Sequence, residues 1–234
     1  MSGDALAGFA GILFDFDGVL VDSEAVGRGA WHSSLQAHGL SLSRAELDAR
    51  PVGQTNADMY AWLQAQYGWT QPESFHAELA ERFMAGFGPA QQIPGAWATL
   101  EALRERGVPF AVASNSSPEE LTFKLRAAGL SDLVQQAFTP ADVAGRAKPA
   151  PDLYQHAAAQ LGLLPSRCLV IEDSALGVRA GVAARATVWG LMYTHSAAYA
   201  PHLWDAGASA LVADHGELRR ALGLEAGESG AELP

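Results

Sequence analysis

The sequence predicts an α/β fold, a parallel β-sheet covered by helices on both faces. Short apolar runs bounded by turn residues alternate along the chain with stretches of helical periodicity, which is typical of such sheets. Polar or acidic residues follow three of these runs directly, and ligands bind beyond the carboxyl ends of parallel strands. Residues 22–93 show helical patterns only. We therefore expect a discontinuous α/β core, residues 1–21 and 94–234, with an α-helical cap domain inserted over residues 22–93.

Composition narrows the class of protein. The 234 residues are 49% hydrophobic and carry a formal net charge of −11, which disfavours a broad nucleic-acid surface. No uncharged apolar stretch reaches the roughly 18 residues of a membrane span. The single cysteine, Cys168, lies in an apolar run, which predicts core packing and fits a reducing compartment. We expect a cytoplasmic monomer without nucleic-acid or membrane partners.

The first apolar run, residues 11–14, leads into two acids and a glycine, Asp15, Asp17 and Gly18. Alternation along a strand places both carboxylates on the same side as the strand ends. Aspartate is rarely buried without a partner, and Mg²⁺ prefers carboxylate, carbonyl and water oxygens. The alternative is a solvated turn after an edge strand. The motif favours a magnesium site or carboxylate chemistry.

Further strands and helices follow in alternation. The later apolar runs predict strands over residues 108–113, 168–171, 186–189 and 208–212. Helical patterns in the core cover about 95–106, 117–128, 151–162 and 174–184. Those in the insertion cover about 24–38, 43–49, 55–67 and 73–86. These ranges place the polar residues that follow each strand at one edge of the sheet.

Ser114 and Asn115 follow the second strand, just before a helix that opens with Pro118. Small hydroxyl and amide groups at a helix N-terminus can bind phosphate together with main-chain N–H groups. Helix capping by Ser116 or Ser117 is the alternative, and both roles are compatible because a cap needs one residue. The segment predicts a phosphate site.

Two further motifs complete the candidate site. Lys148 stands before Pro149, which favours an extended backbone, and it can reach into a site as a point charge. Glu172 and Asp173 end the next apolar run, and adjacent acids repel each other unless a cation offsets their charge. A surface lysine and a helix cap at Asp173 are the alternatives.

In this order, the four segments DFDGVLVDSE, SNSS, KPAPDLY and IEDSALG resemble the haloacid dehalogenase (HAD) superfamily. The resemblance covers nearly the whole chain and lies nearest to the branch of β-phosphoglucomutase and phosphoglycolate phosphatases. It implies a Rossmann-like parallel sheet core with a helical cap between the first and second motifs.

The resemblance also implies roles for individual residues. Asp15 would be the nucleophile that forms an aspartyl-phosphate, and Asp17 would protonate the leaving alcohol and then activate water. Ser114, Asn115 and Lys148 would bind the phosphoryl group. An acid at Asp17 argues against carbon–halogen cleavage, in which no leaving alcohol needs a proton.

The metal site follows from the same resemblance. Asp15, the main-chain carbonyl of Asp17 and Asp173 would bind Mg²⁺, and Glu172 would support the ion directly or through water. Mg²⁺ would let an anionic carboxylate approach an anionic phosphate.

The cap would carry substrate specificity. Its predicted specificity loop contains Gly53, Gln54, Thr55 and Asn56. Two positions that hold a histidine and an arginine in the resembled mutase fall on Gly27 and Asn56 here, which favours hydrolysis over phosphoryl return. We expect a Mg²⁺-dependent phosphatase of a small phosphorylated metabolite, a sugar or polyol phosphate. The alternatives are a phosphomutase of the same fold and a non-catalytic phosphometabolite-binding regulator.

Overall fold

The computed structural model describes residues 6, 8–48, 56–88 and 91–225. The chain divides into two compact units. One, the α/β unit, is built from Met1–Asp22 together with Gly88–Pro234, and the other, the helical unit, is Ser23–Phe87. Each unit has a hydrophobic core of its own and is described separately below.

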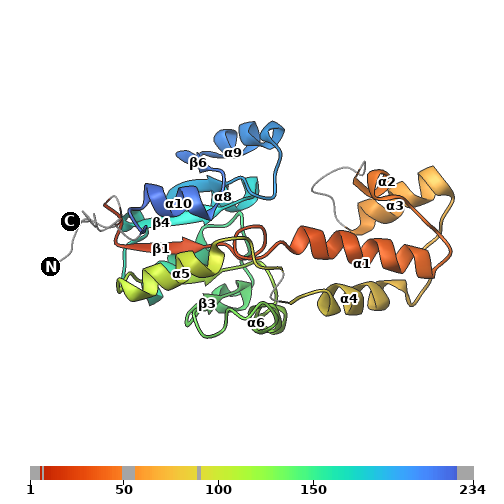
Figure 1. The fold of residues 1–234 in the computed structure, drawn as a ribbon, viewed down its shortest axis with the longest axis horizontal. Helices are drawn as coiled ribbons and strands as arrows, with labels where there is room; N and C mark the ends of the chain where they lie inside the picture. The colour runs from red at the N-terminus through yellow and green to blue at the C-terminus, as the bar shows by residue number, and fades with distance from the viewer. Residues whose placement is uncertain (1–5, 7, 49–55, 89–90, 226–234) are drawn as a thin grey trace, which may run out of the picture. The chain divides into compact units, whose positions relative to one another are not determined.

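A six-stranded parallel sheet forms the centre of the α/β unit (Figure 1). Its strand order is β3-β2-β1-β4-β5-β6, so β1 and β4 are neighbours in the middle of the sheet. The strands are β1 (Gly11–Phe14), β2 (Phe110–Ala113), β3 (Ala137–Phe138), β4 (Cys168–Glu172), β5 (Thr187–Leu191) and β6 (Ala210–Val212). The predicted α/β class with a parallel sheet is confirmed.

The central strands form because their residues are apolar on both faces. Every residue of β1 and of β4 is buried, as expected for strands covered by helices on both sides. Strand β3 was not predicted from the sequence. It is two residues long, too short for an apolar run, and it pairs with the end of β2 at the sheet edge.

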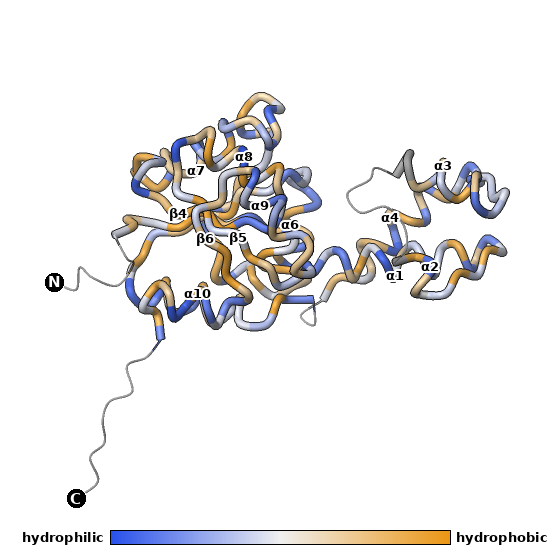
Figure 2. Tube along the Cα trace, turned by 90° about the horizontal axis from the view of Figure 1, so that it is seen from above, coloured by the Kyte–Doolittle hydropathy of each residue, from blue (hydrophilic) through white to orange (hydrophobic). Residues whose placement is uncertain are grey.

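Helices cover both faces of the sheet. They are α5 (Ala96–Glu105), α6 (Pro118–Ala127), α7 (Asp152–Gln160), α8 (Ala175–Ala183), α9 (Ala200–Ala206) and α10 (His215–Ala221), with 3₁₀ turns η2 (Pro140–Val143), η3 (Pro165–Arg167) and η4 (Ala197–Tyr199). Leu13 and Val170 belong to one core cluster with side chains of α7, α8 and α9. Figure 2 shows α10 on the opposite side of the strands from α7 and α8.

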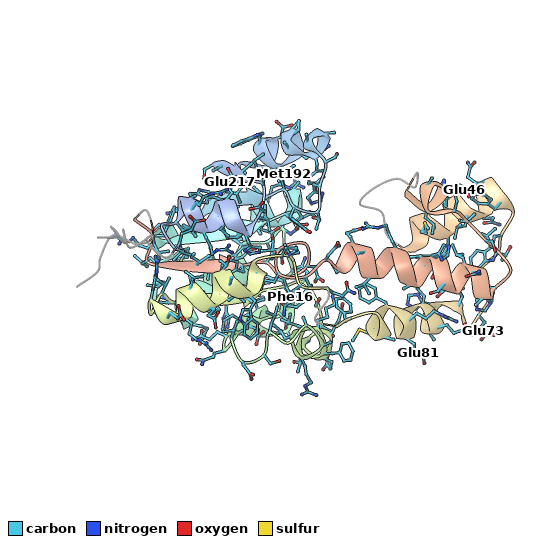
Figure 3. All side chains as sticks on the ribbon, viewed as in Figure 1. Phe16, Glu46, Glu73, Glu81, Met192 and Glu217 are labelled. Carbon is cyan, nitrogen blue, oxygen red and sulfur yellow. The ribbon has the colours of Figure 1, made fainter. Side chains whose placement is uncertain are left out.

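The helical unit contains α1 (Ser23–Ala37), α2 (Arg44–Asp48), α3 (Asn56–Tyr67) and α4 (Phe75–Ala85). Aromatic rings meet at its centre, where the ring centroids of Trp31 and Trp69 lie 5.6 and 4.8 Å from that of Phe75. These two tryptophans therefore pack in the core of this unit. The side chains of Glu46, Glu73 and Glu81 are exposed on the surface of this unit (Figure 3).

Among the helices of the described residues, none is both long enough and apolar enough to cross a membrane.

Candidate active site

The sheet register brings the first and last motifs together. Leu13 pairs with Val170 and Phe14 with Ile171, and the Asp15 N–H donates to the Ile171 carbonyl at 2.9 Å. Side chains alternate along neighbouring strands, so Asp15 lies on the same face as Glu172, the last residue of β4. Two carboxylates thus meet at the carboxyl edge of the sheet.

Lys148 lies between these two carboxylates. Its Nζ donates to Asp15 Oδ1 at 2.6 Å and to Glu172 Oε1 at 2.7 Å. The ammonium also stands 4.6 Å from the ring centroid of Tyr154, on the helix that begins just after it. Burial alone would lower the pKa of Lys148, but the two carboxylates outweigh that effect and raise it. The lysine is therefore held in its charged form.

Asn115 fixes the main chain that carries this lysine. Its side-chain Oδ1 accepts from the Lys148 N–H at 2.9 Å, and its Nδ2 donates to the Lys148 carbonyl at 3.3 Å. Both ends of the amide are thus engaged in positioning Lys148. The predicted binding of phosphate by Asn115 stays a prediction, and the structure adds this second role.

Glu172 is surrounded by donors on both oxygens. Its Oε1 accepts from Lys148 and from the Tyr154 hydroxyl at 2.8 Å. Its Oε2 accepts from the N–H groups of Asp173 and Ser174 at 3.1 Å each and from the Ser174 hydroxyl at 3.0 Å. A side chain at Gly177 would collide with the carboxylate, because a Cβ there would lie 1.6 Å from Oε1. These contacts favour support of a metal through water over direct ligation.

One carboxylate oxygen of Asp173, Oδ2, has two side-chain partners. His195 Nε2 lies 3.1 Å, and Thr194 Oγ1 3.4 Å, from Asp173 Oδ2. The His195 ring stacks on Tyr199 with ring centroids 4.1 Å apart. Gly18 lies against the same oxygen, and a Cβ there would be 1.9 Å from Oδ2, on a backbone with φ of +81°. Glycine is required at this turn for both reasons.

Three carboxylates therefore form one buried acidic cluster. Asp15, Glu172 and Asp173 each place an oxygen within 4.8 Å of the others. Burial raises the pKa of Asp15 well above its usual range, and Glu172 adds to this while Lys148 opposes it. Burial likewise raises the pKa of Asp173, against the hydrogen bond from His195. One lysine leaves an excess of negative charge, and these oxygen ligands fit a divalent cation such as Mg²⁺.

Asp17 lies apart from this cluster. Its Oδ1 accepts from Lys124 Nζ at 3.0 Å, and its Oδ2 from the Ser116 hydroxyl at 3.3 Å. Its side chain is 31% exposed, whereas the other acids of the site are buried. Its carboxylate therefore does not belong to the group of Asp15, Glu172 and Asp173, and its predicted role in proton transfer stays a prediction.

The serines of the loop after β2 have different contacts. Ser117 caps α6, because its hydroxyl accepts from the Glu120 N–H at 3.2 Å. Ser114 is buried, and its hydroxyl accepts from the Ser116 N–H at 3.1 Å. The capping expected from the sequence thus uses Ser117, whereas Ser116 contacts Asp17 and Ser114 contacts Ser116.

Lys124 and His195 contact acids of the site and were not predicted from the sequence. Lys124 occupies a buried position of α6 between Leu121 and Leu125, and a lysine in an apolar i, i+3, i+4 stripe is the signal that could have revealed it. His195 comes to Asp173 from the segment after β5 and carries no local motif. Only the packing of that segment brings it to the site.

The specificity residues predicted for the cap are Gly53, Gln54, Thr55 and Asn56. Gly53, Gln54 and Thr55 lie outside the described residues. Asn56 begins α3, and its side chain also lies outside the described part of the chain. Their role in specificity stays a prediction.

The arrangement defines a class of enzyme. A buried carboxylate next to a charged lysine, a serine-rich loop at a helix N-terminus and an acidic cluster suited to a cation are the kinds of group that phosphoryl-transfer chemistry uses. A family model for haloacid dehalogenase-like hydrolases matches residues 9–185. The chain belongs to this family, as the sequence motifs predicted, and it is an enzyme of the HAD phosphatase type.

Named proteins of similar sequence agree with this assignment. Hexitol phosphatase A of Escherichia coli is 32% identical over 185 residues, covering 74% of this chain and 79% of that protein. Validoxylamine A 7′-phosphate phosphatase of Streptomyces hygroscopicus is 30% identical, covering 79% and 86%. Two longer plant proteins also match, and the matched segment covers 46% and 20% of their lengths.

A solved structure is similar over almost the whole chain. It is a HAD family hydrolase of Deinococcus radiodurans with bound phosphate and sodium, 44% identical to this protein. The match covers 93% of this chain and 98% of that one, with a TM-score of 0.82. The similarity therefore extends beyond the segment that the family model matches.

Proposed function

We propose that this protein is a Mg²⁺-dependent phosphatase of a small phosphorylated metabolite, a sugar or polyol phosphate. The observation that carries the proposal is the contact between Lys148 and Asp15, inside a buried cluster of three carboxylates. The named relatives include phosphatases of a hexitol phosphate and of a phosphorylated validoxylamine, which supports a polyhydroxylated substrate.

In the proposed first step, an oxygen of Asp15 forms a bond to phosphorus as the bond from phosphorus to the leaving alcohol breaks. Asp17 gives its proton to the leaving oxygen. Ser114 and Lys148 bind the transferring group, and the ammonium offsets the charge on its oxygens. Splitting one displacement into two makes each of them easier.

In the second step, Asp17 takes a proton from water as the water oxygen bonds to phosphorus. The bond from phosphorus to Asp15 breaks, and inorganic phosphate leaves with Asp15 and Asp17 restored. Asp15 and Asp173, with the carbonyl of Asp17, would hold Mg²⁺, and Glu172 would act through water. When bound, the ion supplies positive charge that lowers the repulsion between Asp15 and the phosphate.

The proposal is tested by phosphate release from a defined panel. The panel comprises sorbitol 6-phosphate, glucose 6-phosphate, 6-phosphogluconate, phosphoglycolate and p-nitrophenyl phosphate, each with Mg²⁺ and with EDTA. We expect release that requires Mg²⁺ and that Asp15→Asn abolishes, because an amide oxygen is a poor nucleophile. The matched control is Asp132→Asn, an exposed aspartate of the same unit, which should keep wild-type activity.

Other outcomes would identify the alternatives. Conversion of β-glucose 1-phosphate that depends on a bisphosphate primer, with phosphate retained, would indicate a phosphomutase. Binding of panel compounds without turnover would indicate a regulatory protein. Release that persists in Asp15→Asn would contradict the proposed mechanism. The cytoplasmic location and monomeric state expected from the sequence stay predictions.

A further inference from the structure

Lys124 is a buried charge that the mechanism above does not use. It lies in α6, is 2% exposed and stands between Leu121 and Leu125 on the buried face of the helix. A lysine is seldom buried in this way unless its ammonium is paired, because the transfer of a charge out of water is costly. The contacts of Nζ therefore indicate what this residue is for.

Two of these contacts lead to the Asp17 carboxylate. Lys124 Nζ donates to Asp17 Oδ1 at 3.0 Å and to the Ser116 hydroxyl at 3.2 Å. An ammonium can only donate, so the Ser116 hydroxyl accepts from it and gives its own hydrogen to Asp17 Oδ2, 3.3 Å away. Both carboxylate oxygens of Asp17 thus receive a donor.

Two further contacts anchor this arrangement. Glu120, one helical turn before Lys124, also pairs with the ammonium, and its Oε1 lies 2.5 Å from Nζ. The Ser116 N–H donates to the Ser114 hydroxyl, which ties the group to the loop proposed to bind phosphate. The orientation of Asp17 is therefore connected both to α6 and to the phosphate loop.

We propose that Lys124 is a positioning residue for Asp17, which with Ser116 fixes the orientation of the Asp17 carboxyl group for both proton transfers. This inference rests on the proposed phosphatase function. A proton donor is effective only within hydrogen-bond reach of the leaving oxygen, and a displacement of about 1 Å can cost a hundredfold in rate. Lys124 contacts no reacting atom in this scheme and acts through Asp17.

A comparison of two leaving groups distinguishes this positioning role from a merely structural one. An alkoxide needs a proton as it leaves, whereas nitrophenolate is a stable anion near neutral pH and needs little help. Loss of Lys124 should therefore slow the first step for an alkyl phosphate and spare p-nitrophenyl phosphate. General distortion of the site would slow both substrates alike.

The experiment compares single-turnover rates of the first step in wild type, Lys124→Met and Ser116→Ala. The substrates are the alkyl phosphate of the panel that wild type hydrolyses fastest and p-nitrophenyl phosphate. For Lys124→Met we expect a fall of about 10- to 100-fold on the alkyl phosphate and less than about threefold on the aryl ester, with KM little changed. Ser116→Ala should show a smaller fall with the same selectivity.

Arg126→Met is the matched control, because Arg126 is an exposed cation on the same helix and its loss changes the net charge equally. It should retain wild-type rates on both substrates. Equal losses on both substrates in Lys124→Met, no loss, or a faster first step would overturn the inference. Should Lys124→Met fail to fold, Ser116→Ala decides, since an unselective or absent effect there contradicts it too.

Failure of the inference differs from failure of the proposed function. If only the inference is wrong, wild type still hydrolyses both substrates through Asp15, and Lys124→Met does not slow the alkyl phosphate selectively. If the phosphatase assignment is wrong, wild type shows no first step that depends on Asp15 on either substrate, which would overturn both proposals.

Discussion

At the scale of single residues, several side chains of the site position their neighbours through hydrogen bonds. Asn115 engages the main chain of Lys148 with both ends of its amide, and His195 holds one oxygen of Asp173. Such contacts orient a neighbouring group, whether or not the partner also contacts the substrate. In metal sites, their loss typically costs 10- to 100-fold in affinity or activity.

His195→Ala should therefore weaken Mg²⁺ binding. With His195 gone, the partner left to Asp173 Oδ2 among the described residues is Thr194, at the longer distance, so the carboxylate is less well oriented toward a metal. We expect the dissociation constant for Mg²⁺, measured by calorimetry without substrate, to rise about 10- to 100-fold. His202→Ala is the control, because His202 is exposed and also lies against Tyr199. An unchanged constant in His195→Ala would contradict the assigned role.

At the scale of elements, a buried histidine joins three segments of the α/β unit. His215, the first residue of α10, places Nδ1 3.0 Å from Thr99 Oγ1 on α5 and Nε2 2.8 Å from the carbonyl of Val19, in the loop after β1. Arg219 of α10 also donates to the carbonyl of Gly95 at 3.0 Å. Two helices thereby secure the loop that follows the nucleophile strand.

This histidine makes stability depend on pH. Burial lowers the pKa of His215 to about 4 from an ordinary 6.5, with smaller opposing effects from the Val19 carbonyl and Asp214. The folded protein keeps the imidazole neutral where the unfolded chain already binds a proton. The stabilisation is therefore complete above about pH 6.5 and is lost as the pH falls toward 4, by about 3 kcal/mol in total.

His215→Gln should flatten that part of the pH dependence. We expect the free energy of unfolding of wild type, from urea titrations, to fall more between pH 7 and pH 4.5 than that of His215→Gln. In His202→Gln the wild-type fall should persist, since His215 is still present. Equal pH dependence in wild type and His215→Gln would show that this imidazole does not control acid stability.

At the scale of the whole molecule, the distribution of charge is uneven. The chain has only two lysines, Lys124 and Lys148, within a net charge of −11, and both are buried against the acids of the first motif. Each contacts a different acid, Asp17 or Asp15. The cluster of Asp15, Glu172 and Asp173 nevertheless retains more carboxylates than cations in its immediate contacts.

Mg²⁺ should therefore stabilise the fold itself. A cation that binds only the folded cluster raises the free energy of unfolding, by about 2.7 kcal/mol at a hundred times its dissociation constant. We expect thermal unfolding of wild type to shift upward with MgCl₂ relative to NaCl of equal ionic strength. Asp173→Asn should lose most of this shift. An equal shift in both proteins would mean that Mg²⁺ only screens the overall negative charge.

The sequence by itself determined the class of fold, the family and the residues of the four motifs. These follow from local facts: apolar runs of strand length, helical periodicity between them, and carboxylates placed directly after strands. The strand ends meet at one edge of a parallel sheet, so the sequence placed Asp15 and Glu172 at the same edge. The pairing of β1 with β4, which sets the two residues side by side, comes from the structure.

Only the tertiary structure decided which side chains support the motifs. Lys124 and His195 are brought to Asp17 and Asp173 by packing of α6 and of the segment after β5, across sequence separations of 107 and 22 residues. Strand β3 likewise depends on pairing with β2 and on no apolar run of its own. Contacts of this kind arise from burial and hydrogen bonding between distant segments. A local pattern can mark a residue such as Lys124 as unusual, but it does not encode which partner that residue meets.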